Sequence, residues 1–247
     1  VVRRLRVSLQ HLRHTEAHDI SDCQSQQPGH RRDCHPFVVD QSHALFTDYS
    51  EIKKCDCGTL LNKRFPGQQK IKVYKPLLSE VIDSVEKYIA AHSLPAVQYN
   101  IEIKSTLETD GTFHPRIAEF TERVMDVLRE KNITERVIIQ SFDVRPLQSI
   151  RKKYSEIKLA LLVENRLGPE KNIEKLGFVP DIYSPEHFLV NEELMKFAVE
   201  NKMKVIPWTV NEKEEIISVL NIGVDGIITD YPDRAKDIIA GFHSQKK

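Results

Sequence analysis

Two opposite charges stand close together in the strand-like stretch VQYNIEIKS, residues 97–105. Side chains alternate along a β-strand, so Asn100, Glu102 and Lys104 share one side and the two isoleucines share the other. Burying a carboxylate costs several kcal/mol unless a cation or a hydrogen-bond donor meets it. Two interpretations follow: an ion pair that lines the interior, or a carboxylate that binds Mg²⁺ or Ca²⁺ beside a lysine that binds phosphate.

Three later strand-like stretches also carry polar side chains near their ends. They offer Gln140 and Ser141 in IIQSFD, Trp208 and Asn211 in VIPWTVN, and Asp225 and Asp230 in GVDGIITDYPD. Two of these residues have a structural alternative. Trp208 could be a core residue that only buries apolar surface, and Asp230 could be the N-cap of the last helix or a residue of the turn before it. Gln140 and Ser141 suit orienting or structural roles.

The elements that must position these groups alternate along the chain from about residue 76. Apolar spacing predicts helices, the first of them opened by Ser79 and Glu80, over 76–93, 114–132, 144–154, 170–177, 191–202, 212–222 and 233–242. Strands are expected between them at 98–104, 136–142, 157–164, 180–184, 204–210 and 225–230. This alternation predicts an α/β fold with a parallel sheet and right-handed crossovers.

The chain length and this pattern favour one domain over residues 1–247, a (β/α)8 TIM barrel. Residues 1–97 would then supply the first two strands, for which 37–39 and 70–74 are the best, though short, candidates. A doubly wound open sheet is the alternative, but no Gly-x-Gly-x-x-Gly follows a strand. In a barrel, active sites form where strands end, so Glu102 and Lys104 should face the mouth.

The charge balance and hydropathy exclude several kinds of partner. Lys and Arg total 36, as do Asp and Glu, so no net charge favours nucleic acid or an anionic membrane surface. No stretch is long and apolar enough for a transmembrane helix, and the N-terminal residues lack a signal-peptide core. We expect a soluble chain acting on a small molecule. The sequence does not indicate the cellular compartment, since a signal for export to the periplasm or the cell exterior could be absent from this chain. It does not indicate the oligomeric state either.

Several motifs in order resemble one family. The run KVIPWTVNEKEEIISVLNIGVDGIITDYPDR, residues 204–234, resembles the C-terminal signature of the glycerophosphodiester phosphodiesterase family. YNIEIKS and IIQSFD are similar to its third and fourth strands, and YSEIKKCDCG followed by KPLLSEVIDSVEKY is similar to the segment before them. The likeness covers about residues 45–240.

This resemblance implies a barrel enzyme that hydrolyses glycerophosphodiesters to glycerol 3-phosphate and an alcohol with a divalent cation, Mg²⁺ or Ca²⁺. It implies that Glu102 is a metal ligand, that Lys104 contacts phosphate and that Trp208 lies against the glycerol moiety. Gln140 is grouped with them as a substrate-binding or orienting residue. The alternative is a non-catalytic barrel that binds a phosphate or glycerol ligand without turnover.

The opening motifs of the family are not present. The chain contains no His-Arg-Gly and no Pro-Glu-Asn, and the expected position of the second strand, which carries Glu-x-Asp in the family, is occupied by HTEAHDISDCQSQQPGHRRDCHPF, residues 14–37. The remaining candidates there are Glu16 and Asp19 as metal ligands, although their spacing places them on opposite faces of a strand, and His18 and His35 as acid–base groups.

Residues 1–43 differ from the rest of the chain in pattern. They hold six of the ten histidines, a stripe that could bind transition metals, and they show neither helical nor strand periodicity. We interpret this segment as disordered, as a divergent replacement or as translated out of frame, and residues 44–247 as the family-like barrel. Activity would then be impaired.

Overall fold

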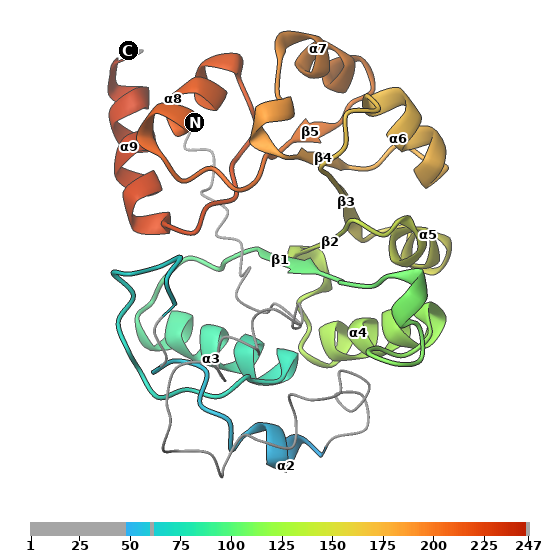
Figure 1. The fold of residues 1–247 in the computed structure, drawn as a ribbon, viewed down its shortest axis with the longest axis vertical. Helices are drawn as coiled ribbons and strands as arrows, with labels where there is room; N and C mark the ends of the chain where they lie inside the picture. Colours follow the sequence, from blue (N-terminus) through green and yellow to red (C-terminus); the bar gives the residue numbers. More distant parts are fainter. Residues whose placement is uncertain (1–47, 60–61, 246–247) are drawn as a thin grey trace. The chain divides into compact units, whose positions relative to one another are not determined.

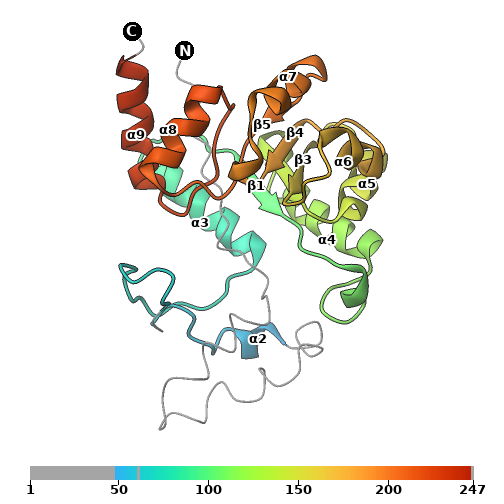
Figure 2. The ribbon, with the colours of Figure 1, turned by 45° about the horizontal axis from the view of Figure 1, so that its top comes forward.

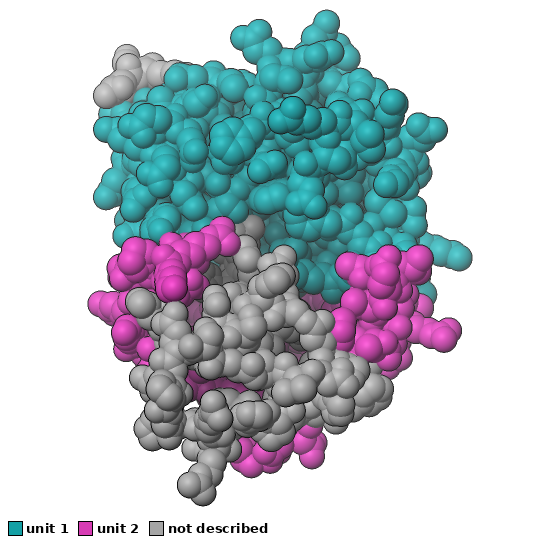
Figure 3. All heavy atoms as spheres, in the orientation of Figure 1, with its two compact units in different colours: residues 1–11, 96–105, 132–247 teal, residues 12–95, 106–131 magenta. Residues whose placement is uncertain are grey.

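The computed structural model describes residues 48–59 and 62–245 and divides into two compact units. Among these residues, unit 1 comprises 96–105 and 132–245, and unit 2 comprises the remainder up to residue 131 (Figure 3). The interpretations of residues 1–43, and the expected strand at 37–39, lie outside the described residues.

A parallel sheet runs through unit 1 in the order of the sequence. Its strands, drawn in Figures 1 and 2, are β1 Tyr99–Glu102, β2 Val137–Ser141, β3 Lys158–Val163, β4 Ile182–Pro185 and β5 Lys204–Val205. Every neighbouring pair is parallel. The predicted α/β fold with a parallel sheet is thereby confirmed.

The segment 225–230, where a strand is expected, continues this sheet with only a few backbone hydrogen bonds. The Ile228 amide donates to Pro207 O (2.8 Å), and the Val210 amide donates to Ile228 O (2.8 Å). These bonds follow the parallel direction of the preceding strands, although the segment is not a regular strand. The chain from 205 to 210 is therefore hydrogen-bonded on both sides.

Helices follow the strands of unit 1 much as the apolar spacing predicts. They are α5 Val144–Lys153, α6 Pro169–Leu176, α7 Glu192–Glu200, α8 Lys213–Ile222 and α9 Pro232–Gln245, with short 3₁₀ turns η3 Thr134–Arg136 and η4 His187–Leu189. Asp143 begins α5 by accepting the Arg145 amide (3.0 Å), and Gly177 ends α6 with φ +83°. No helix in the described ranges is long and apolar enough to cross a membrane.

The core of unit 1 contains one layer of side chains from successive strands. It is formed by Ile138, Ala160, Ile182, Ile206 and Ile228, and Trp208 packs against it. Each large aliphatic side chain buried here stabilises the fold by about 1.5–3 kcal/mol relative to exposure. Because side chains alternate, residues two and four positions further along each strand face the same interior, nearer the strands' carboxyl ends.

Unit 2 contains the helices α2 Tyr49–Ile52, α3 Leu78–Ala91 and α4 Ile117–Glu130 and the turn η2 Leu107–Thr109. Glu80 opens α3 as predicted, since its Oε2 accepts the Leu77 amide (3.1 Å). Ser79 lies inside the helix and does not cap it, which corrects that part of the prediction.

The short strand expected at 70–74 is not formed, and this prediction was wrong. The segment is bonded to residues 57–58 through the Cys57 amide, which donates to Val73 O (2.7 Å), and the Ile71 amide, which donates to Gly58 O (3.3 Å). Two bonds to a bend do not extend into a ladder, and the side chains of Ile71 and Val73 are 57% and 47% exposed. The alternating pattern there does not mark a buried face.

Candidate active site

Glu102 and Lys104 end β1 as a close pair of opposite charges. Lys104 Nζ lies 3.5 Å from Glu102 Oε1, and the two side chains are 27% and 15% exposed. Asn100, two residues earlier on the same face, lines an interior cavity, so this face points inward as expected. The ion pair of the first interpretation is therefore present in the structure, at the carboxyl end of the strand.

Gln140 stands beside Glu102 on the neighbouring strand but is only 1% exposed. Its Oε1 accepts a hydrogen bond from Asn100 Nδ2 (2.8 Å). Both residues line the cavity, whose volume of about 10 Å³ is close to the room needed by one water molecule. This depth favours an orienting role, while direct contact between Gln140 and substrate stays a prediction.

A carboxylate that sequence reasoning missed fastens the chain just after Lys104. Asp143 Oδ2 accepts a hydrogen bond from Ser105 Oγ (2.8 Å) and from Arg145 Nη2 (2.6 Å). Burial alone would raise the pKa of Asp143, but hydrogen bonds from Arg145 and Ser105 outweigh it and hold the pKa below its usual value of 3.8. Its place just before a predicted helix was the available signal for a cap.

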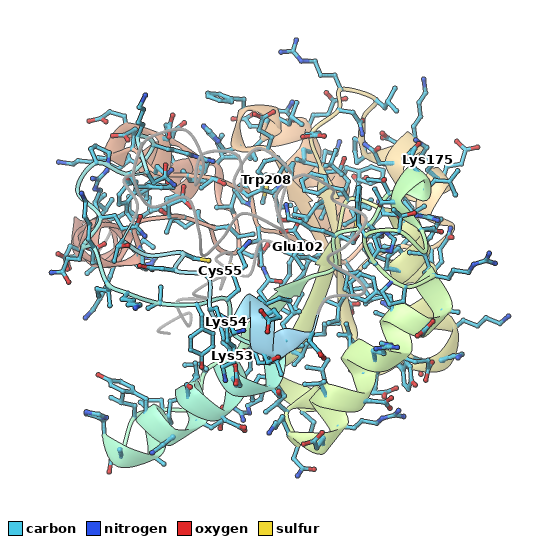
Figure 4. The ribbon with its side chains drawn as sticks, turned by 60° about the horizontal axis from the view of Figure 1, so that its bottom comes forward. Lys53, Lys54, Cys55, Glu102, Lys175 and Trp208 are labelled. Carbon is cyan, nitrogen blue, oxygen red and sulfur yellow. The ribbon has the colours of Figure 1, made fainter. Side chains whose placement is uncertain are left out.

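Trp208 lies across the mouth from the end of β2. Its ring centroid is 5.2 Å from that of Phe142, with the two planes at 86°. Phe142 follows β2 and Trp208 follows β5, two strands that are separated in the sheet by β3 and β4, so the sheet curves enough for their side chains to meet. Figure 4 shows Glu102 and Trp208 on the side of this sheet away from α6, where Lys175 lies.

The hydrogen bonds of Trp208 determine which part of the ring is available. Its Nε1 donates to Ser184 O (2.8 Å), so the polar edge is already used. The ring is half-buried and packs on the apolar layer below it. Both the core-packing interpretation and a contact with substrate carbon atoms are compatible with this position, because one face packs and the ring remains partly exposed.

The two aspartates of the last strand-like segment have structural partners. Asp225 Oδ2 accepts the Val205 amide (3.0 Å) at the amino end of β5, which is opposite to the mouth. Asp230 and Asn211 hold each other, through Asn211 Nδ2 to Asp230 Oδ2 (3.0 Å) and the Asp230 amide to Asn211 Oδ1 (2.9 Å). The turn interpretation of Asp230 is favoured.

Two further ionisable residues follow β4, where the expected strand had already ended. Glu186 forms a parallel bridge with Trp208, and the His187 amide donates to Trp208 O (2.8 Å). His187 Nε2 lies 3.4 Å from Glu215 Oε1, within ion-pair distance. Neither buried ring nitrogen makes a hydrogen bond to the residues that the structure describes.

The predicted metal and acid–base residues of the N-terminal segment lie outside the described residues: Glu16, His18, Asp19 and His35. Within the described ranges, no group of three His, Cys, Asp or Glu side chains could hold a metal ion. Glu102 provides a hard oxygen ligand, but one carboxylate does not complete a site. The described residues by themselves therefore do not fit a bound cation.

Comparison with known proteins agrees with the resemblance seen in the motifs. Residues 38–234 match the model of the glycerophosphoryl diester phosphodiesterase family. A glycerophosphodiester phosphodiesterase from Caldanaerobacter subterraneus subsp. tengcongensis is 29% identical over 225 residues, which cover 88% of this chain and 84% of the relative. Coverage of this extent necessarily takes in part of residues 1–43.

Solved structures show the same fold. A candidate glycerophosphoryl diester phosphodiesterase from Silicibacter pomeroyi DSS-3 has a TM-score of 0.67 and 27% identity, over 80% of this chain and 69% of its own. A phosphodiesterase from Oleispira antarctica, solved with the product sn-glycerol-3-phosphate, has a TM-score of 0.61 at 19% identity, over 78% of this chain and 71% of its own. These neighbours are of the TIM-barrel type, and that is the fold class of this protein. The chain belongs to the glycerophosphoryl diester phosphodiesterase family.

Proposed function

We propose that this protein hydrolyses glycerophosphodiesters to glycerol 3-phosphate and an alcohol, and that the reaction depends on a divalent cation. Family membership supports the reaction class. The observation that carries the proposal is the pair of Glu102 and Lys104, 3.5 Å apart at the carboxyl end of β1. A carboxylate next to an ammonium group at a barrel mouth suits a phosphodiester, which brings one negative charge and several oxygen acceptors.

In this reaction the oxygen of a water molecule bonds to phosphorus while the water gives a proton to a general base, the bond from phosphorus to the alcohol oxygen breaks, and that oxygen takes a proton from a general acid. Lys104 contributes by stabilising the negative charge that builds on the nonbridging oxygens. Its neighbour Glu102 holds the ammonium group in place and is the proposed oxygen ligand of the cation. We propose Glu16 and Asp19 as the further ligands.

The acid–base groups are proposed to be His18 and His35. Among the described histidines, His187 is the one at the carboxyl end of a strand, yet both of its ring nitrogens are buried and Glu215 lies 3.4 Å away. A general acid or base must reach the proton that it transfers, so His187 does not suit this role.

The test is hydrolysis of glycerophosphocholine by the full chain, with glycerol 3-phosphate measured by a coupled enzyme assay. The protein is first stripped of metal and then assayed with Mg²⁺, with Ca²⁺ and with EDTA. We expect product with at least one cation and none with EDTA. If a sample that is folded by circular dichroism forms no product under any condition, the hydrolase proposal is wrong and the non-catalytic, ligand-binding barrel takes its place.

A further inference from the structure

Glu186 lies beside Trp208, and no cation in the described part of the chain neutralises its carboxylate. Glu186 follows β4, where its backbone amide donates to Val163 O (2.7 Å) and its backbone angles are φ −53° and ψ 135°. The next bond along, from the Trp208 amide to Pro185 O (3.0 Å), fixes the two residues side by side. Backbone hydrogen bonds therefore fix the position of the Glu186 main chain next to Trp208.

The direction of Glu186 follows from its neighbours on the strand. Ile182 and Ser184 both line the interior cavity, so the next alternate residue points to the same side, one layer nearer the carboxyl ends. Ile206 lines the cavity too, which places Trp208 in that upper layer by the same alternation. Glu186 and Trp208 thus face the mouth together, and both are half-buried.

Two other pairs of charged side chains near the carboxyl ends of the described strands are already matched. Lys104 lies 3.5 Å from Glu102, and Arg145 lies 2.6 Å from Asp143. Glu186 is in no ion pair with the residues that the structure describes. A half-buried carboxylate gains most from hydrogen-bond donors supplied by a ligand, because such bonds to a charged acceptor are stronger than neutral ones.

The aromatic groups beside Glu186 suit the carbon atoms of a small polyol. The indole N–H of Trp208 is occupied by Ser184 O, so the ring offers its carbon face. Phe142, 41% exposed, meets Trp208 at right angles and extends the apolar surface. A ring face for C–H groups next to a carboxylate for O–H groups is the combination that a vicinal diol requires.

We infer that Glu186 accepts hydrogen bonds from the free hydroxyl groups of the glycerol moiety while Trp208 and Phe142 contact its carbon atoms. Glu186 is then a specificity-determining residue, which selects glycerol phosphodiesters over phosphodiesters of simple alkyl alcohols. This inference rests on the proposed function for its substrate. It is tested without turnover, so that the two can fail separately.

The test uses product binding and the chain's single tryptophan, Trp208, as the fluorescent reporter. The full chain, with the cation present, is titrated with glycerol 3-phosphate and with n-propyl phosphate, which has the same phosphate and carbon number but neither hydroxyl group. Any contribution of Lys104 or the cation cancels in the ratio of the two dissociation constants. We expect glycerol 3-phosphate to bind about tenfold more tightly, since bonds to a charged acceptor are lost with the analogue.

Variants then assign that preference to one side chain. Glu186→Met, unbranched and without an oxygen acceptor, is expected to reduce the ratio to about twofold or less, and Glu186→Gln to an intermediate value. Glu174→Gln, an exposed change on α6, should leave the ratio unchanged. Thermal unfolding of each variant checks that the loss is not one of folding.

The inference is overturned if Glu186→Met keeps the tenfold preference, or if the unaltered chain binds both phosphates equally. It is equally overturned if choline, tested as a cationic ligand, binds to the unaltered chain and loses affinity in Glu186→Gln while the phosphate ratio stays constant. That result would assign Glu186 to a cationic alcohol instead. Hydrolysis measured in parallel is not needed for any of these outcomes.

Discussion

Acidic residues stand at both ends of the unit 1 sheet, and the two ends use them differently. At the amino ends, Asp181 Oδ2 accepts the Leu159 amide (3.0 Å), and Asp225 Oδ2 accepts the Val205 amide (3.0 Å). At the carboxyl ends, Glu102 faces a lysine, and Glu186 forms a backbone bridge with Trp208 and is in no ion pair with the residues that the structure describes. The same type of side chain therefore fixes strands at one end and is available for a ligand at the other.

The backbone explains this division. A strand that begins beside a loop leaves amide groups to be satisfied, and a short carboxylate can accept them. At the opposite end, the chain turns outward into the next helix, and the inward-facing side chains surround a space where a small molecule can bind. We therefore expect changes at the carboxyl ends to affect catalysis more than stability, and changes at the amino ends to do the reverse.

The largest expected effect comes from Lys104→Met at the carboxyl end. Loss of the ammonium group removes charge stabilisation in the transition state, so kcat/KM for glycerophosphocholine should fall about 10²- to 10³-fold. Because the side chain is only 27% exposed and its loss leaves Glu102 without its cation, the unfolding temperature should also fall, so kcat/KM is compared per folded molecule. Lys175→Met, an exposed change on α6, is the matched control. A fall of less than about threefold would contradict the proposed contact with phosphate.

Asp143 is an exception to this division, because it follows the carboxyl end of β2 but has a structural role. Asp143→Ala removes the cap of α5 and the partner of Arg145, so we expect a loss of about 2 kcal/mol in the free energy of unfolding at pH 7. Urea unfolding measures it, with the exposed Asp126→Ala as the control expected to change stability by less than about 0.5 kcal/mol.

The pH dependence of that loss has a definite sign. The pKa of Asp143 is lower in the folded protein than its usual value of 3.8, so its ionised form stabilises the fold above that value. The contribution is lost as the pH falls below 3.8 toward the folded pKa. The difference between the unaltered chain and Asp143→Ala should therefore shrink on going from pH 5 to pH 3. A difference that grows in acid would contradict this account.

The sequence predicts some properties of a residue better than others. Alternation along VQYNIEIKS correctly predicted which side of β1 Glu102 and Lys104 share, because a period of two depends on the strand alone. Asp225 was grouped with the site residues for a different reason, its place near an end of a strand-like stretch. Its role depends on which end of the neighbouring strand it reaches, and this register comes from packing between strands, not from local pattern.

The sequence also does not predict how deeply a side chain is buried in the barrel. Gln140 looks like a site residue by type and spacing, yet it is 1% exposed and bonded to Asn100. Glu186 was missed for a related reason: the expected strand ended at 184, so the residue was left in a loop although the bridge to Trp208 continues the alternation. Following the period of two for one more step would have found it.

The smallest expected effect is at the amino end. Asp225→Ala removes the acceptor for the Val205 amide and should cost about 1 kcal/mol of stability, with kcat/KM per folded molecule unchanged. Asp225→Asn keeps an oxygen acceptor and should lose less. If Asp225→Ala lowered kcat/KM tenfold without changing the unfolding temperature, the division between the two ends would be wrong.

The most direct test of the central claim is the rate of glycerol 3-phosphate release by Glu102→Gln relative to the unaltered chain, at saturating cation and equal folded concentration. This change keeps the size of the side chain, removes its charge and replaces one carboxylate oxygen by an amide NH₂ group. The account predicts a fall of about 10²-fold or more with nearly the same unfolding temperature. A variant that retains most of the activity would contradict it, because the chemistry would then not depend on the carboxylate at the end of β1.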